Sequence, residues 1–186
     1  DVYKRQELNR EICESQKNEI EWVTTADTSG MQTYRRSATF LMLKAVRDVY
    51  GRSVNICVEY SLSKGYYCSV TGDVAVDETF IGKISYRMKE LVDECVPINK
   101  LTYGLDEVIR IFHDEEMYDK EKLFRYRRAS KVNLYEMDGF RDYFYGYMVP
   151  DTSYLTVWKL FLYDKGFVIQ PVSYTHLRAH ETCADL

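Results

Sequence analysis

Two stretches of the chain carry apolar residues at helical spacing. The clearer one, residues 78–95, follows Asp77, a good N-cap residue, and ends before Pro97. Its apolar positions recur every three or four residues: Phe80, Ile81, Ile84, Met88, Leu91, Val92 and Cys95. A second helix is predicted from a Thr33 cap to Tyr50, with a glycine as its stop. Both helices are expected to pack their apolar faces on a sheet.

Alternating apolar and polar residues predict the strands of that sheet. Residues 54–62 and 66–70 are predicted to form a hairpin around Lys64 and Gly65. Other elements are expected as strands at 19–25, 98–103, 132–137, 154–163 and 167–170, short helices at 105–113 and 120–127, a turn at 27–30 and an irregular segment at 143–148. This order predicts an α+β fold with helices on one face of a mostly antiparallel sheet.

Composition indicates a folded domain and bears on where in the cell the protein would be found. The chain is 46% hydrophobic, yet no apolar run approaches membrane-span length, so no membrane contact is expected. Cysteines before the C-terminal tail are scattered without a Cys-x-x-Cys pair, which is typical of reduced thiols in a cytoplasmic protein and favours no metal site. They are Cys13, Cys57, Cys68 and Cys95.

One stretch departs from the overall net charge of −4. Residues 119–131 hold six cations and two anions, which gives a local charge of +4. A cationic stretch in an acidic chain favours a phosphate-bearing partner, and tyrosines beside arginines can stack on bases. A solvated helix end followed by a strand would have the same composition.

The two ends of the chain resemble translated adapter DNA. Residues 1–6, DVYKRQ, can be back-translated to a DNA whose opposite strand, in a shifted frame, encodes the Val-Ser-Tyr-Thr-His found near the C-terminus. We therefore expect residues 1–6 and 171–186 to be an adapter artefact, with Pro171 ambiguous, and the remainder to be an internal fragment of a longer gene. The tail also contains a metal-like spacing that is excluded on the same ground, formed by His176, His180 and Cys183.

Four internal segments carry a family resemblance: TYRRSATFLMLKAVRDVYG, GYYCSV, DETFIGKISYRMKELVDECVPINK and FRDYFYGYMVP. They are similar to the second domain of threonyl-tRNA synthetases, which hydrolyses mischarged tRNA and has a relative in alanyl-tRNA synthetase. In that family a small TGS domain comes before it. The resemblance implies the C-terminal remnant of a TGS-like domain at 7–30 and an editing-like domain at 31–170.

The residues that would perform the family's hydrolysis are largely replaced. The family's His-Ser-x-x-His pair corresponds to Arg36 and Phe40 here, and its later Asp-x-Cys-x-Gly-x-His segment retains Asp142 but has Phe144 and Met148 at the cysteine and last histidine. Ester hydrolysis needs a base or a metal to activate water, and arginine, phenylalanine and methionine supply neither. We therefore assign no catalytic residue. Asp142 itself is predicted to be a structural hydrogen-bond acceptor.

A closer resemblance is to bacterial nucleoside kinases related to uridine kinase, which carry TGS-like and synthetase-like regions before a phosphate-loop domain. TYRRS, KGYYC, MYDKEKLFRYRR, VNLY and DYFYGYMVP carry it. No Gly-x-x-x-x-Gly-Lys-Ser/Thr motif is present in this chain. The resemblance implies that a kinase domain, with its ATP and magnesium, would lie beyond Gln170. No cofactor is expected in the present residues.

Three functions remain open. The first is an accessory domain of a nucleoside kinase that binds RNA or a nucleotide in the former hydrolytic cleft, without DNA specificity, or that regulates the missing ATP-dependent kinase domain. Its predicted phosphate contacts are Arg35, Arg36, Arg125, Arg127 and Arg128, and its predicted stacking residues are Tyr143, Tyr145 and Tyr147. The second is a divergent aminoacyl-tRNA editing hydrolase, or threonyl-tRNA synthetase fragment, that uses Asp142. The third is a purely structural domain that docks the kinase or builds an oligomer.

Overall fold

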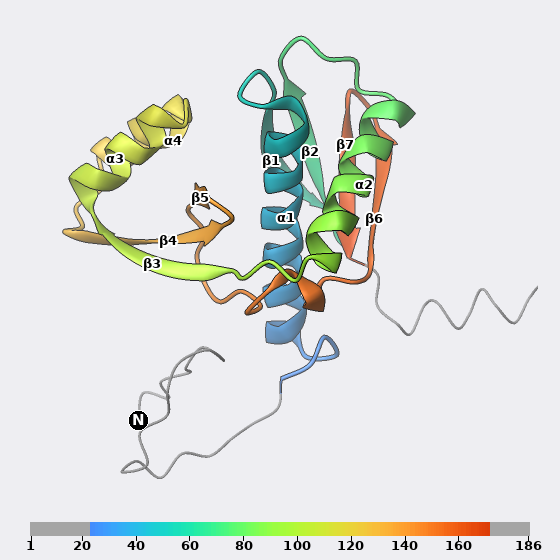
Figure 1. Cartoon of the computed structure of the whole chain (residues 1–186), viewed down its shortest axis with the longest axis horizontal. Coiled ribbons are helices and arrows are strands. Elements are labelled where there is room, and N and C mark those ends of the chain that lie inside the picture. Colours follow the sequence, from blue (N-terminus) through green and yellow to red (C-terminus); the bar gives the residue numbers. More distant parts are fainter. Residues whose placement is uncertain (1–22, 172–186) are drawn as a thin grey trace, which may run out of the picture.

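The computed structural model describes residues 23–171 (Figure 1). The adapter-like residues 1–6 and 172–186, the tail histidines and most of the strand predicted at 19–25 lie outside this range. Of the TGS-like segment predicted at 7–30, only residues 23–30 are described.

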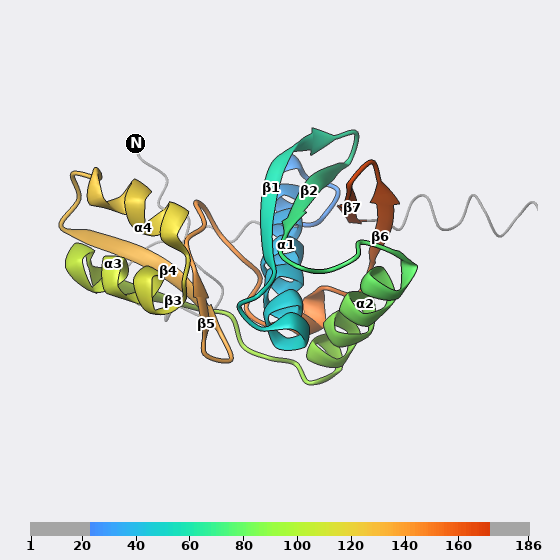
Figure 2. The same cartoon turned by 90° about the horizontal axis from the view of Figure 1, so that it is seen from above.

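The larger layer is a four-stranded sheet with two helices on one face. Its strands run in the order β1-β2-β7-β6, and every neighbouring pair is antiparallel (Figure 2). They are β1 (Asn55–Leu62), β2 (Gly65–Thr71), β6 (Trp158–Tyr163) and β7 (Gly166–Pro171). The covering helices are α1 (Thr28–Tyr50) and α2 (Glu78–Asp93). Pro171, left ambiguous by the sequence, is buried and opposite Trp158 in the β6–β7 pair.

A smaller layer lies on the other side of α1 (Figure 1). It is a separate antiparallel sheet in the order β3-β4-β5, covered by two short helices. Its elements are β3 (Asn99–Gly104), α3 (Leu105–Asp114), α4 (Tyr118–Arg125), β4 (Lys131–Met137) and β5 (Phe140–Asp142). A single 3₁₀ turn, η1 (Thr152–Tyr154), leads back to the larger sheet.

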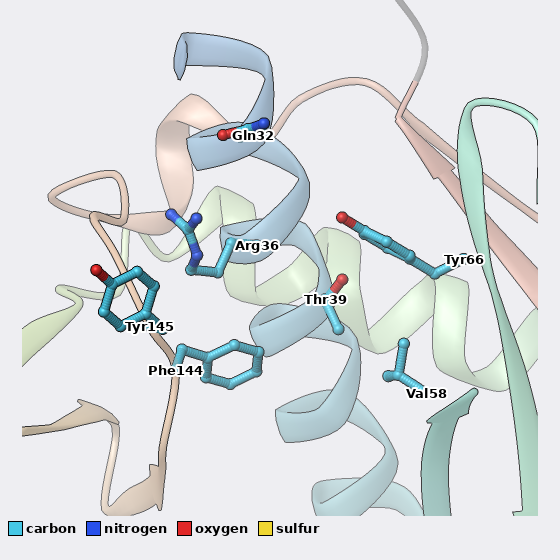
Figure 3. A pocket seen from close by; sticks show the side chains of 7 residues that line it. All are labelled: Gln32, Arg36, Thr39, Val58, Tyr66, Phe144 and Tyr145. Atoms are coloured by element: carbon cyan, nitrogen blue, oxygen red, sulfur yellow. The ribbon is translucent and has the colours of Figure 1, made fainter. Parts of the chain in front are cut away.

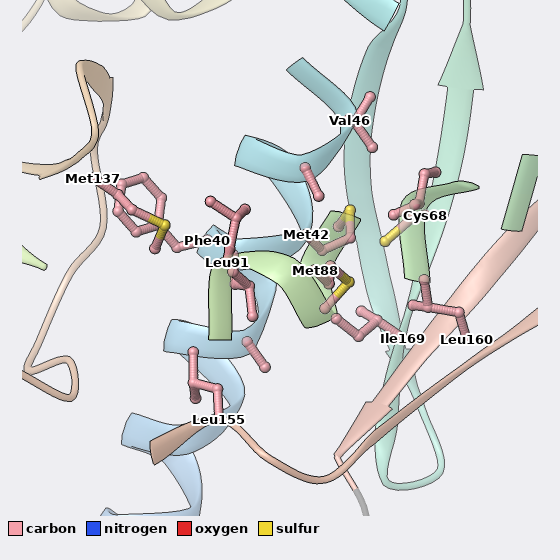
Figure 4. Close-up of a cluster of buried hydrophobic side chains, with 14 of the residues drawn as sticks. Phe40, Met42, Val46, Cys68, Met88, Leu91, Met137, Leu155, Leu160 and Ile169 are labelled. Atoms are coloured by element: carbon pink, nitrogen blue, oxygen red, sulfur yellow. The ribbon is translucent and has the colours of Figure 1, made fainter. Parts of the chain in front are cut away.

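Helix α1 joins the two layers because it buries side chains on both sides. Met42 and Val46 belong to the cluster that α2 and the larger sheet complete, while Phe40 reaches Met137 and Phe140 of the smaller sheet (Figure 4). A second cluster lies under α3 and α4 and consists of Val108, Phe112, Phe124, Val132 and Leu134. Burial of these apolar side chains is the main driving force for both layers.

The α+β class predicted from the sequence is confirmed, and so is the Asp77 cap, whose carboxylate accepts a hydrogen bond from the Phe80 N–H at 2.8 Å. Two local predictions at the start of α1 were wrong, and the strand predicted at 154–163 begins only at Trp158. Helix α1 begins at Thr28 rather than after Thr33, so residues 28–30 are helical and not part of a turn. The Thr33 hydroxyl instead donates to the Ser29 carbonyl inside the helix. The predicted domain boundary after residue 30 therefore falls within α1.

The sheet arrangement differs from the single sheet that the strand pattern suggested. The strands form two sheets, and the three-residue strand β5 was not predicted.

Over residues 23–171, no helix has both the length and the apolar character needed to cross a membrane.

Thr152 of η1 ties the end of α2 to the segment that returns to the larger sheet. Its fully buried hydroxyl accepts from the Val96 N–H at 2.8 Å and donates to the Leu91 carbonyl at 2.5 Å. Thr152→Val should lower the free energy of unfolding by about 1–2 kcal/mol, because both backbone groups lose a buried partner. Urea denaturation measures this loss, and the exposed Thr156→Val is the control, expected to change stability by no more than about 0.5 kcal/mol. Equal midpoints for the two variants would contradict this role.

Candidate functional site

A cleft of about 330 Å³ opens where α1, the β1–β2 hairpin and the segment after β5 meet. Its lining comes from three parts of the chain, as Figure 3 shows. These residues are Gln32, Arg36 and Thr39 from α1, Val58 and Tyr66 from the hairpin, and Phe144 and Tyr145 from the later segment. The helical residues are spaced four and three apart, so the α-helix places them on one face.

Arg36 is held by the backbone that follows β5. Its Nη1 donates a hydrogen bond to the Tyr147 carbonyl. Gly146 has φ of +104°, and a Cβ there would lie 2.7 Å from the Arg36 Cζ, so only glycine allows this close contact. Arg36 and Gly146 therefore fix the segment against α1, while the other guanidinium donors border the cleft (Figure 3).

Ser37, which the family motif shares, has a structural role in this chain. Its buried hydroxyl donates to the Thr33 carbonyl at 2.8 Å and accepts from the Val149 N–H at 3.0 Å. Both of these contacts are to backbone groups, so Ser37 is a second attachment point between α1 and the later segment.

Of the four residues at the motif's histidine and cysteine positions, all except Arg36 pack in the apolar core. The rings of Phe40 and Phe144 lie 5.5 Å apart edge-on, and Phe40 also stacks on Phe140 at 5.6 Å. Met148 packs against the same core. Phe40 is fully buried and does not line the cleft, so only Arg36 and Phe144 of the replaced positions remain available to a ligand.

Asp142, the acid retained from the family motif, is paired with a lysine of α4. Its carboxylate is buried and both oxygens lie 2.5 Å from the Lys120 Nζ of α4. Oδ1 also accepts from the Tyr143 N–H at 2.6 Å. Asp142 does not line the cleft, and this ion pair occupies the carboxylate that a hydrolytic mechanism would use.

The other predicted ligand residues separate into different surroundings. Tyr145 lines the cleft and is 84% exposed, whereas the ring of Tyr147 lies beside the Lys100 ammonium, 5.4 Å from the centroid. Arg35 is not in the lining, and its buried Nε has no hydrogen-bond partner among the described residues. Arg127 and Tyr143 contact each other on the α4 side.

Arg125 is likewise engaged outside the cleft. Its Nη2 lies 2.5 Å from the Glu121 carboxylate, which also contacts His113 Nδ1 at 3.0 Å. Hydrogen bonds from Arg125 and His113 hold the pKa of Glu121 below its usual value. Arg128 is exposed near the end of α4. The predicted binding residues are therefore not one site: Arg36 and Tyr145 line the cleft. Four others lie on the α4 side, namely Arg125, Arg127, Arg128 and Tyr143. Arg35 and Tyr147 belong to neither group.

Four lining residues were not predicted from the sequence: Gln32, Thr39, Val58 and Tyr66. Helical spacing from Arg36 could have indicated Gln32 and Thr39. Nothing local indicates Val58 and Tyr66, because their position depends on how the hairpin packs against α1.

The described residues offer little for metal or thiol chemistry. No group of three or more His, Cys, Asp or Glu side chains in residues 23–171 could hold a metal ion. Cys68 of β2 is buried, and burial raises the pKa of its thiol to about 12. Partial desolvation and the neighbouring Glu59 carboxylate also raise the pKa of Cys57 on β1, although this residue is exposed. Both thiols therefore stay protonated near neutral pH and are poor nucleophiles.

Comparison with known proteins finds relatives among the threonine–tRNA ligases. No protein-family model matches the chain. The chain is 32% identical over 150 residues to a threonine–tRNA ligase of Syntrophotalea carbinolica, covering 80% of this chain and 23% of that protein. It is 26% identical over 155 residues to the threonine–tRNA ligase of Carboxydothermus hydrogenoformans, covering 83% and 24%, and 25% identical over 142 residues to that of Francisella tularensis subsp. novicida, covering 76% and 22%.

The chain thus spans less than a quarter of the length of these curated relatives. At this modest identity, over about four fifths of the chain, the similarity supports a threonyl-tRNA synthetase-like domain with an editing-domain-like fold. These relatives correspond to the synthetase resemblance found in the sequence. They do not test the nucleoside-kinase resemblance.

Proposed function

We propose that this domain binds the single-stranded end of an RNA in the cleft and does not hydrolyse an ester there. The observation that carries the proposal is the lining itself: one guanidinium, three aromatic rings, and the neutral side chains of Gln32, Thr39 and Val58. The domain would correspond to residues 31–170, the editing-like region predicted from the sequence. Similarity to threonine–tRNA ligases supports RNA as the ligand class.

The aromatic residues suit unstacked bases. Tyr66, Phe144 and Tyr145 approach the cleft from two sides, and bases of single-stranded RNA commonly stack on such rings (Figure 3). Arg36 adds donors that can meet a phosphate or a base edge without further ordering, because Gly146 and Tyr147 already hold it.

Hydrolysis is disfavoured by the same lining. A general base must be able to accept a proton at the operating pH, and Arg36 is always cationic. The nearest retained acid of the family motif, Asp142, is paired with Lys120. The divergent-hydrolase alternative would need a base that the cleft lining lacks. The nucleoside-kinase accessory function stays a prediction about sequence beyond Gln170.

Tyr145 offers a direct test because it is largely exposed and its loss should not disturb the core. Tyr145→Ala should weaken the binding of a 5′-labelled single-stranded RNA about tenfold, since a stacked base is worth about 1–3 kcal/mol. Fluorescence anisotropy gives the Kd, and Tyr86→Ala on α2, where the tyrosine is 67% exposed, is the matched control. Equal affinity of both variants, or deacylation of aminoacyl-tRNA above the rate in buffer, would reject the proposal.

A further inference from the structure

We propose that a second surface contacts the phosphate backbone of the RNA whose end enters the cleft. This basic surface consists of Tyr126, Arg127, Arg128 and Tyr143. The proposal rests on the proposed function, because it concerns how the same RNA continues away from the cleft.

The first step is the charge that remains after internal pairing. Of the six cations in residues 119–131, Lys120 is paired with Asp142 and Arg125 with Glu121. The others have no carboxylate within 4.0 Å among the described residues: Lys122, Arg127, Arg128 and Lys131. Only Asp119 of the two local anions is left to offset them. The structure therefore concentrates unpaired positive charge at the C-terminal end of α4 on a chain whose net charge is −4.

The second step is the geometry of Arg127. Its guanidinium lies 4.7 Å from the centroid of the Tyr143 ring and 5.1 Å from that of Phe124, and Nη2 donates to the Tyr143 hydroxyl at 2.9 Å. These contacts restrict the side chain although the residue is exposed. The remaining N–H donors of the fork are thus presented in a fixed orientation, which suits bidentate contact with a phosphate.

The third step is the position of this surface relative to the cleft. Tyr143 and Phe144 are consecutive, yet the Tyr143 ring contacts Phe124 of α4 while Phe144 lines the cleft. The basic surface and the cleft therefore border one short segment from opposite sides. An RNA strand bound at Phe144 and Tyr145 would therefore need to extend past only one residue of the chain, Tyr143, to meet Arg127.

RNA suits this surface better than an anionic membrane does. Tyr126 is 80% exposed beside the two arginines, and an exposed ring next to guanidinium groups can stack on a base. Tyr143 of this surface directly precedes Phe144 in a cleft lined by aromatic rings, and the chain is similar to tRNA ligases.

The experiment compares salt dependence of binding for the Arg127→Ala/Arg128→Ala double variant and the unmodified domain, with a 5′-labelled single-stranded RNA. Removing two phosphate contacts should reduce the slope of log K against log salt by about 1.4 and weaken binding about tenfold at low salt. Arg127→Lys/Arg128→Lys should keep the slope, because the charges remain. Lys83→Ala/Lys89→Ala, which removes two exposed cations from α2, is the matched control and should leave both quantities unchanged.

The outcomes separate this inference from the proposed function. If Tyr145→Ala weakens binding but the double arginine variant keeps the original slope, the basic surface is excluded and the cleft proposal stands. If Lys83→Ala/Lys89→Ala lowers the slope as much as the arginine variant, binding is nonspecific and the inference is overturned. Binding to vesicles of anionic lipid with no binding to RNA would overturn both.

Discussion

Replacing Phe40 by alanine should lower the free energy of unfolding by about 3–5 kcal/mol, the usual cost of removing a buried phenylalanine. Phe40 is fully buried, and its ring contacts Phe140 of the smaller layer and Phe144 of the cleft segment. The substitution loses the burial of a large apolar side chain, and it also leaves a cavity between the two layers that α1 holds together. Urea denaturation followed by circular dichroism measures it.

Val49→Ala is the control for this prediction because it removes an apolar side chain from the same helix at an exposed position. Its stability should change by no more than about 0.5 kcal/mol. A Phe40→Ala variant that unfolds within about 1 kcal/mol of the unmodified domain would contradict the packing described for α1. Phe40→His is also expected to be destabilising, because the imidazole would be buried between two phenyl rings without a hydrogen-bond partner.

The elements that could be predicted from the sequence are those with local signals. Helix α2 combines a capping aspartate, a helical run of apolar residues and a following proline, and all three act within one segment. The start of α1 was misjudged because Asp27 at its N-cap makes no side-chain hydrogen bond to the helix, while Thr33 fits a cap pattern but lies inside. Local patterns of this kind are therefore ambiguous when the cap is weak.

Strand pairing could not be predicted in the same way. Tyr66 of β2 lies opposite Ile169 of β7, about a hundred residues later, and alternation specifies a face but not a partner. The division into two sheets follows from such distant pairings. The lining of the cleft depends on it too, since Tyr66 borders the cleft only because the β1–β2 hairpin packs beside α1.

The arrangement of the candidate site could not be predicted for a similar reason. Ligand contact by Arg36 stays a prediction; the residue borders the cleft, and its contact with Gly146 depends on the backbone of a segment 110 residues away. The basic stretch was treated as one binding surface. Ion pairs with Asp142 and within α4 divide it, and charge counting along the sequence cannot reveal which cations have partners.

Lys120→Met should lower the free energy of unfolding by about 2–3 kcal/mol, because it leaves the buried Asp142 carboxylate without its cation. Breaking a fully buried pair costs about 3–5 kcal/mol, and the smaller figure reflects the Lys120 side chain, which is 39% exposed. Lys122→Met, on the same helix and exposed, is the control and should stay within about 0.5 kcal/mol. Equal stability of the two variants would show that the pair contributes nothing.

A second substitution separates loss of the cation from loss of the lysine side chain. Adding Asp142→Asn to Lys120→Met should recover at least half of the lost stability, because the uncompensated charge disappears while an amide oxygen can still accept from the Tyr143 N–H.

The single Lys120→Met variant also bears on the hydrolase alternative, because it releases the one retained acid of the family motif. If Asp142 could act as a base, this variant would gain deacylation of aminoacyl-tRNA. We expect none, because the carboxylate lies outside the cleft lining and removing Lys120 does not bring it to a ligand held by Arg36 and Tyr145.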